Sequence, residues 1–410
     1  MRWWVLALLS VAIAGNYYAY DSIAPIAELL RSQRGLGQSE IGLLNAVFSL
    51  PNIPLALIGG LIIDRWGAAR AALLTAFLCC LGSVLTAWGT PFAIMVTGRL
   101  IFGVGEETLL IALIAGLAAW FVQGRTALAM SLFFSLARVG SYLADISPSW
   151  APSLYQEGWQ PPLWLAAGLT GISLAAAAIY AVFDATRRPV AITPSDHTAW
   201  RDIAGFDRSF WYILALNVLF ASVFFPFRST FAIEYFQDAK GLSLAAAGQV
   251  NSMVFFAAIF ATPLFGWVAD RFGRRTLMMM LAAALMPLTF LVLGATDWSL
   301  WISTALMGLS FSVVPAVIWP STALLVEPRR LGTALGLVNV LQNLGLAAAN
   351  LAAGWLNDQS QAGPQNPAGY GPMLWLFGLL GLAAFLSVAL LWLRETGPQG
   401  HGLDAARATP

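Results

Sequence analysis

Apolar residues dominate this chain and form twelve long runs, with polar residues concentrated in the short links between the runs. Each run approaches the roughly 20 residues that a helix needs to cross a hydrocarbon core. The pattern predicts an all-α membrane protein with twelve transmembrane helices. The predicted spans are 3–20, 41–63, 69–88, 91–121, 126–150, 162–184, 209–233, 243–269, 276–294, 298–325, 330–356 and 371–393.

Basic residues are distributed unevenly between the two sides of the predicted membrane. With the N-terminus in the cytoplasm, 15 of the 21 Lys and Arg residues lie in cytoplasmic links or at the termini, three lie in the opposite links, and three fall within spans. Cytoplasmic links of membrane proteins carry an excess of Lys and Arg. The bias therefore predicts that both termini are cytoplasmic.

Composition agrees with a membrane protein and argues against several other classes. The 410 residues are 59% hydrophobic and 10% charged, with a formal net charge of +1, and contain no basic tract for nucleic acid. Cys79 and Cys80 are neighbours in one predicted span, so they offer no disulfide framework or metal-ligand spacing. Both His197 and His401 lie in polar segments. We therefore expect no enzyme activity, no cofactor and no metal site.

A short motif occurs twice, each time in the link between the second and third predicted helices of a six-helix half. The first copy, GGLIIDRWGAAR, contains Asp64 and Arg65, and the second, GWVADRFGRR, contains Asp270 and Arg271 at an offset of 206 residues. Glycine permits a tight turn and close helix approach, while Asp and Arg bind neighbouring helix ends by charge and dipole. We predict that these four charged residues support conformational switching.

The repeated motif and its placement resemble the major facilitator superfamily. The resemblance implies two pseudo-symmetric six-helix bundles, with the substrate near the membrane midplane between them. It divides the chain into an N-terminal bundle at 1–188, a cytoplasmic linker at 189–208, a C-terminal bundle at 209–396 and a cytoplasmic tail at 397–410. In the first copy of the motif, alanines follow the glycine where the superfamily usually has basic residues. The inner gate formed by this copy is therefore expected to be weaker than the one formed by the second copy.

Longer stretches look like a family of lysosomal dipeptide transporters within that superfamily. They include GRLIFGVGEETL, SLARVGS and LQNLGLA, and the likeness extends over nearly all twelve spans. The resemblance implies facilitated passage of dipeptides, with Glu107 and Arg138 holding the two charged ends. Animal members commonly have glycine at the position of Glu106, and they carry a sorting extension and an accessory subunit of which this chain gives no sign. We expect no obligate protein partner.

The cellular location is predicted from composition. The chain is rich in arginine and alanine and contains no N-x-S/T glycosylation site. These features favour the inner membrane of a bacterium, where the lipid bilayer and a small-molecule substrate would be the partners.

Helix geometry separates the two adjacent glutamates in GEETLL. Neighbouring residues point about 100° apart on a helix, so Glu106 and Glu107 serve different surfaces. Arg99 and Glu106 are seven residues apart and share one stripe. A charge that faces lipid costs roughly 2.5–3.5 kcal/mol even on lenient scales, so these groups face the protein interior or a cavity. We assign Glu107 to the substrate and Arg99 and Glu106 to packing or coupling.

The fifth span carries a polar line formed by Arg138, Ser141 or Tyr142, and Asp145. The planar fork of Arg138 suits a carboxylate, and Glu107 accepts a protonated amine, so a zwitterion offsets the desolvation of both residues. The alternative is that the two side chains pair with each other as a packing lock.

Further candidates are polar or aromatic residues within spans. Tyr17, Tyr20 and Asp21 lie near the outer end of the first span, where an interfacial aromatic belt is the alternative. Polar groups within a span need hydrogen-bond partners, so Asn251, Gln342 and Asn343 either contact substrate or bridge helices. Trp319, directly before Pro320, forms either a cavity wall where the helix bends or a packing contact. Ser141, on the polar line of the fifth span, is the remaining substrate candidate.

An outer gate is predicted where Arg228 follows Pro226 toward the outer end of the seventh span. Glu234 lies a turn and a half further along and is the predicted partner of Arg228. Asp145 is assigned a similar gating role.

Three functions remain open from the sequence. The first is a uniporter of dipeptides or similar small zwitterions that works by alternating access. The second is a proton-coupled symporter of an organic anion, in which Arg138 holds the substrate and Glu106 or Glu107 carries the proton. The third is a receptor or scaffold that transports nothing, although such a protein has no need of repeated gating turns.

Overall fold

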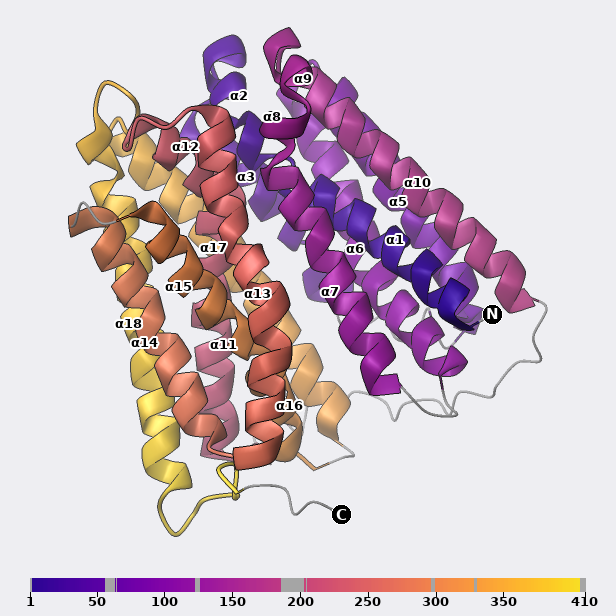
Figure 1. The fold of residues 1–410 in the computed structure, drawn as a ribbon, viewed down its shortest axis with the longest axis vertical. Coiled ribbons are helices and arrows are strands. Elements are labelled where there is room, and N and C mark those ends of the chain that lie inside the picture. Colours follow the sequence, from indigo (N-terminus) through magenta and orange to yellow (C-terminus); the bar gives the residue numbers. More distant parts are fainter. Residues whose placement is uncertain are drawn as a thin grey trace. The chain divides into compact units, whose positions relative to one another are not determined.

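The computed structural model describes residues 2–55, 63, 65–121, 126–185, 203, 205–295, 299–327 and 330–405. Over these residues, regular secondary structure is helical apart from one isolated bridge (Figure 1). Within the same ranges, nine helices are long and apolar enough to cross a membrane, which confirms the all-helical membrane architecture. They are Ala68–Trp88, Phe92–Trp120, Gln160–Ala185, Arg208–Asp238, Leu244–Phe272, Arg275–Gly294, Leu300–Leu324, Leu331–Gln359 and Pro367–Glu395.

The other three predicted spans also contain helices. These are α1 (Arg2–Asp21), α3 (Gln38–Ser49) and α7 (Thr126–Asp145). The span predicted at 41–63 is not continuous, because α3 ends just before Pro51, whose ring clashes with a preceding helical turn and which offers no N–H. The total of twelve spans and the cytoplasmic position of the termini stay predictions.

The chain divides into two compact units. The first unit contains Met1–Pro194 and Ser229–Ser252, and the second contains Ser195–Arg228 and Met253–Pro410. The boundaries after Arg228 and after Ser252 fall inside helices rather than in links, since residues 208–238 and 244–272 are each helical throughout. The division into two bundles at a 189–208 linker, made from the sequence, stays a prediction.

Close helix packing organises the first unit around α1, α5 (Ala68–Trp88), α6 (Phe92–Trp120), α7 and α10 (Gln160–Ala185). A Cβ atom at Gly82 of α5 would lie 2.4 Å from the backbone nitrogen of Phe102 on α6. A Cβ atom at Gly140 of α7 would lie 2.0 Å from the carbonyl oxygen of Ala14 on α1. Only glycine allows such approach, so these two positions set how α6 and α7 lie in the unit.

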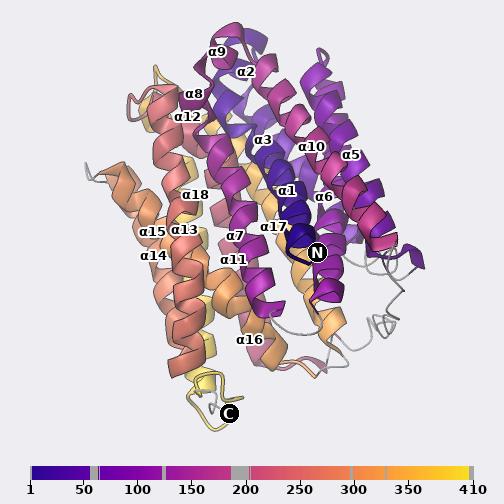
Figure 2. The same cartoon turned by 45° about the vertical axis from the view of Figure 1, so that its right-hand side comes forward.

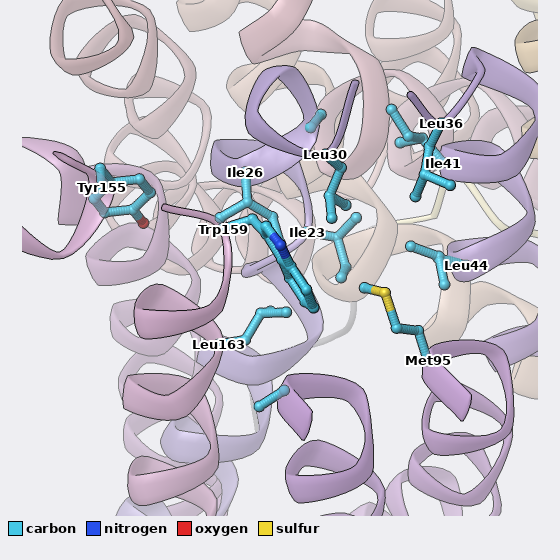
Figure 3. Close-up of a cluster of buried hydrophobic side chains, with 12 residues drawn as sticks. Ile23, Ile26, Leu30, Leu36, Ile41, Leu44, Met95, Tyr155, Trp159 and Leu163 are labelled. Atoms are coloured by element: carbon cyan, nitrogen blue, oxygen red, sulfur yellow. The ribbon is translucent and has the colours of Figure 1, made fainter. Parts of the chain in front are cut away.

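One end of the first unit is closed by short helices, among them α2 (Ala27–Arg34) and α9 (Pro152–Glu157). Both views place α2 and α9 at the same end, opposite the N-terminus (Figures 1 and 2). A buried apolar cluster lies beneath them, in which Trp159 is set between Ile26 and Leu163 (Figure 3). We call this end, which the charge bias predicts to be outer, the α2 end.

The second unit contains α11 (Arg208–Pro226), α14 (Arg275–Ala295), α15 (Leu300–Val313), α16 (Trp319–Leu324), α17 (Leu331–Gln359) and α18 (Gly371–Glu395). Aromatic packing forms part of its core, where the rings of Phe224 and Phe311 stack with centroids 4.2 Å apart. Two π-helical segments interrupt the helices. Phe227–Phe231 follows Pro226 directly and contains the boundary between Arg228 and Ser229, and Val314–Ile318 surrounds Pro315 in the second unit. Such segments often mark functional positions in helices.

The C-terminal segment packs on the second unit near the repeated turn. Arg394 donates two hydrogen bonds, of 3.2 and 2.5 Å, to the carboxylate of Asp207. Asp404 accepts a hydrogen bond of 2.8 Å from the backbone N–H of Thr276. Burial alone would raise the pKa of the Asp207 carboxyl, but hydrogen bonds from Arg394 and from the N–H of Ser209 lower it to about 2. Through its Asp404 side chain, the C-terminal segment caps the first turn of α14.

Candidate functional site

The two adjacent glutamates of α6 lie in different surroundings. Glu106 is 6% exposed, whereas Glu107 is half-buried. The 100° step of the helix explains the difference, because one face of α6 packs inside the first unit while the next residue is turned away from it. Glu107 therefore remains accessible enough to meet a ligand, and Glu106 does not.

Arg138 of α7 lies beside Tyr17 of α1. The guanidinium carbon is 4.9 Å from the centre of the Tyr17 ring, which is a cation–π distance. Both side chains are half-buried, like Glu107. The glycine at position 140 permits this arrangement, because it lets α7 approach α1 next to Arg138. The first unit thus carries a carboxylate, a guanidinium and a phenol ring that all keep some exposure.

Arg99 of α6 is buried and surrounded by backbone carbonyl groups. It donates hydrogen bonds to Leu44 O, Ala19 O and Tyr20 O at 3.2 to 3.3 Å, and to the side-chain oxygen of Asn45 at 2.5 Å. These bonds tie α6 to α1 and α3. The contacts support a packing role for Arg99.

Tyr20 and Asp21 differ from Tyr17 in their surroundings. The ring of Tyr20 packs against Phe48 at a centroid distance of 4.6 Å, and the guanidinium of Arg99 lies 5.6 Å from it. Asp21 is buried. Of the three candidates from the first span, Tyr17 is half-buried and stacked with Arg138, whereas Tyr20 and Asp21 are buried.

The outer end of the seventh predicted span, from Ser229 onward, belongs to the first unit. Arg31 of α2 forms an ion pair with Glu234 of α12 (Ala232–Asp238) and a second with Asp238 at 3.1 Å. The side chain of Glu234 is almost fully buried. Arg31 was not among the residues predicted to pair with Glu234, for which Arg228 was the expected partner. Arg228 is itself fully buried, with its guanidinium carbon 4.0 Å from the centre of the Phe255 ring.

One hydrogen bond and one close backbone approach fix the first turns of α13 (Leu244–Phe272) on the end of α7. Asn251 donates to a carboxylate oxygen of Asp145 at 3.0 Å, and both residues are buried. A Cβ atom at Gly248 would lie 2.1 Å from the carbonyl oxygen of Asp145. We call residues Ser229–Ser252, which pack in the first unit through these and the Glu234 contacts, the docked segment. Ser141 is buried on α7, four residues before Asp145.

In the second unit, three polar side chains form a chain of hydrogen bonds. Asn217 donates to Gln342 at 2.8 Å and accepts from the indole N–H of Trp319 at 3.2 Å. Asn343 donates to the side chain of Asn339 at 2.5 Å. The sequence analysis missed Asn217, although a single Asn in an apolar span was the available signal. Asn217 links two of the predicted candidates, Gln342 and Trp319.

The repeated motif is described best in its second copy. Asp270 is 72% exposed and lies 3.8 Å from Arg275, while Arg271 stacks over the rings of Trp267 and Phe272 at 5.8 and 5.7 Å. Gly273 adopts a left-handed φ of 66°, as the tight turn requires.

The first copy of the motif is only partly covered. Asp64 lies outside the described residues, and Arg65 is exposed. Over the described ranges, no group of three or more His, Cys, Asp or Glu side chains could hold a metal ion.

Comparisons with known proteins agree with this architecture. The human (Homo sapiens) lysosomal dipeptide transporter MFSD1 is 29% identical over 98% of this chain and 88% of its own length. The probable sulfoacetate transporter SauU of Cupriavidus necator is 22% identical over 82% of this chain and 83% of its own. Among solved structures, the nucleoside transporter NupG has a similar fold, with a TM-score of 0.76 over 95% of this chain and all of that chain at 13% identity.

A family model decides the classification. The model of the Major Facilitator Superfamily matches residues 9–230 and again 218–410, so each half of the chain matches separately. The two matches fit the motif that recurs at Asp64 and Asp270. The resemblance found in the sequence is confirmed, and the chain is an integral membrane transporter of the Major Facilitator Superfamily.

Proposed function

We propose that this transporter is a uniporter that moves dipeptides or similar small zwitterions by alternating access. The observation that carries the proposal is a set of three partly exposed side chains in the first unit. It presents Glu107 and Arg138, two side chains of opposite charge on neighbouring helices, both half-buried, with Tyr17 stacked on the guanidinium. The relatives named as lysosomal dipeptide transporters support the substrate class.

The chemistry of the two ends follows from the side chains. A guanidinium offers two parallel N–H donors to a carboxylate, and the Tyr17 ring restricts the plane in which that fork lies. A carboxylate such as Glu107 accepts hydrogen bonds from a protonated amine. A dipeptide carries both groups, so it compensates both protein charges, whereas a monovalent ion compensates one.

The contacts of the docked segment supply a gate for this carrier. Its ion pairs with Arg31 and its hydrogen bond to Asp145 would close the α2 end of the first unit, and their release would open it. We assign gating to Arg31, Glu234 and Asp145 on this basis. The charged residues of the two repeated turns, Arg65 and Arg271 among them, are proposed to act in the same cycle.

A proton-coupled symporter of an organic anion is the second candidate. It is favoured by the burial of Glu106, a carboxylate next to the ligand group Glu107, and by the relative named as a probable sulfoacetate transporter. In that mechanism Arg138 holds the anion and Glu106 carries the proton. We place the protein in a bacterial inner membrane on the composition of its sequence.

Uptake into proteoliposomes tests the proposal. Purified protein is reconstituted and offered dipeptides, single amino acids and organic acids, each with and without an inward proton gradient. Dipeptide flux that runs down its own gradient and ignores the proton gradient is the expected result. Anion uptake that requires the proton gradient would replace the proposal with the symporter, and no flux of any substrate would refute both.

A further inference from the structure

Asn45 of α3 connects two buried groups through the opposite ends of its amide. Its oxygen accepts a hydrogen bond of 2.5 Å from Arg99, and its nitrogen donates to the carbonyl oxygen of Ser229 at 3.0 Å and to the hydroxyl of Thr230 at 2.7 Å. All four residues are at most 2% exposed. The side chain therefore links α6 to the docked segment without access to water.

The orientation of this amide is dictated by its neighbours. Arg99 has only donors, so the amide oxygen must face it. The carbonyl of Ser229 has only acceptors, so the amide nitrogen must face that group. Aspartate at this position would satisfy Arg99 but would set a carboxylate against the carbonyl of Ser229. The contact with Ser229 therefore requires asparagine at this position, whereas the contact with Arg99 would be made by either asparagine or aspartate.

The contact falls at a special point in the chain. Ser229 and Thr230 lie in the π-helical segment Phe227–Phe231, and the boundary between the two compact units runs between Arg228 and Ser229. Asn45 therefore donates hydrogen bonds to the first two residues of the docked segment. Arg99, held in place by the carbonyls of Ala19, Tyr20 and Leu44, fixes the other side of the amide.

We propose that Asn45 is the buried latch of the gate, a positioning residue whose amide nitrogen holds the docked segment in the first unit. Loss of that donor releases Ser229–Ser252 and favours the open form of the α2 end. The inference rests on the proposed alternating-access function, since a latch matters only where the segment must detach. It adds a gating residue that makes no charged contact with the segment it holds.

The test measures release of the docked segment with a thiol reporter and no substrate. Ser252, buried in the docked segment, is replaced by cysteine in a Cys79→Ala, Cys80→Ala background. The rate of maleimide labelling is then measured on purified protein in detergent. Asn45→Asp and Asn45→Ala are compared with Thr230→Val, which removes one acceptor of the amide. Asn16→Asp is the matched control, because Asn16 is a buried Asn of the same unit whose side chain donates to Ala12 O of its own helix.

We expect Asn45→Asp to raise the labelling rate about tenfold, as the loss of one buried hydrogen bond shifts the closed form by about an order of magnitude. Asn45→Ala should also raise it, Thr230→Val should raise it less, and Asn16→Asp should leave it within about twofold. If Asn45 only supports packing, Asn45→Ala raises labelling and Asn45→Asp does not, which overturns the proposal. An equal rise in Asn16→Asp overturns it too. A failure of dipeptide uptake would refute the proposed function without changing these rates.

Discussion

Arg31 and Glu234 are 203 positions apart in the sequence and form an ion pair inside the first unit, between α2 and α12. The two partners differ in exposure, with the side chain of Arg31 26% accessible and that of Glu234 1%. A carboxylate this deeply buried depends on its partner, because an unpaired buried charge costs several kcal/mol. In the proposed gate, this pair would hold the closed form by charge.

Removal of Arg31 should open this gate. We expect Arg31→Ala to favour release of the docked segment by about 2 kcal/mol, the value of a hydrogen bond to a charged group. The labelling rate of the cysteine at position 252 measures the release. Glu234→Gln in the Arg31→Ala background should restore part of the closed form, since it removes the charge left unpaired. Lys240→Ala serves as the control, and an Arg31→Ala protein that labels like the parent contradicts the gate.

Substitution of the ligand groups should abolish transport and spare the fold. Glu107→Gln removes the charge that accepts the amine, and Arg138→Lys keeps the positive charge but loses the planar fork. We expect each to reduce dipeptide uptake by about tenfold or more, with an unchanged melting temperature. Normal uptake by both variants would show that these residues do not hold the substrate. Aggregation of both would favour the packing lock.

Tyr17 should matter through its ring rather than its hydroxyl. Tyr17→Phe keeps the surface on which the Arg138 guanidinium lies, whereas Tyr17→Ala removes it. We expect Tyr17→Phe to transport normally and Tyr17→Ala to raise the KM for dipeptides about fivefold, in line with a cation–π contact of about 1 kcal/mol. Loss of uptake in Tyr17→Phe would instead assign a direct role to the hydroxyl.

Arg99 should behave differently from Arg138 although both are arginines within spans. Arg99→Ala removes the hydrogen bonds that Arg99 donates to three backbone carbonyls and to the Asn45 amide, each worth about 1.5–3 kcal/mol as a bond to a charged group. We expect a large fall in melting temperature and in yield. A stable Arg99→Ala protein with a raised KM would mean that Arg99 contacts substrate.

The C-terminal segment should add stability that depends on pH. The pKa of Asp207, about 2 in the folded protein, lies below the ordinary value near 3.9. A depressed carboxyl contributes stability that is present above the unfolded pKa and is lost as the pH falls through the folded pKa, here between about 4 and 2. Asp207→Asn should therefore lower the melting temperature at pH 7 and have a much smaller effect near pH 2. An equal effect at both pH values would contradict the ion pair with Arg394.

The sequence predicted most of the helices because apolar runs of membrane length are a strong signal. It also separated Glu106 from Glu107, since the step of a helix is fixed. The breaks at Pro51 and after Pro226 were not predicted as breaks, because composition there stays apolar across the proline.

Contacts between residues on different helices were harder to predict than the helices themselves. Nothing in the local pattern joins Arg31 to Glu234 or Asn45 to Ser229, since such pairs depend on how distant helices pack. Single amides such as Asn45 and Asn217 carry no charge and stand alone in apolar runs, so they gave a weak signal. Their hydrogen bonds are nevertheless the ones that connect the predicted residues.

The π-helical segment Phe227–Phe231 also fixes the register of everything that follows it. A π turn holds one residue more than the α-helical turn that it replaces. Deletion of one residue there would restore a regular α-helix and rotate Ala232–Asp238 by about 100° about its axis. Glu234 would then face away from Arg31, so the ion pair on which the proposed gate rests depends on a single inserted residue in the helix.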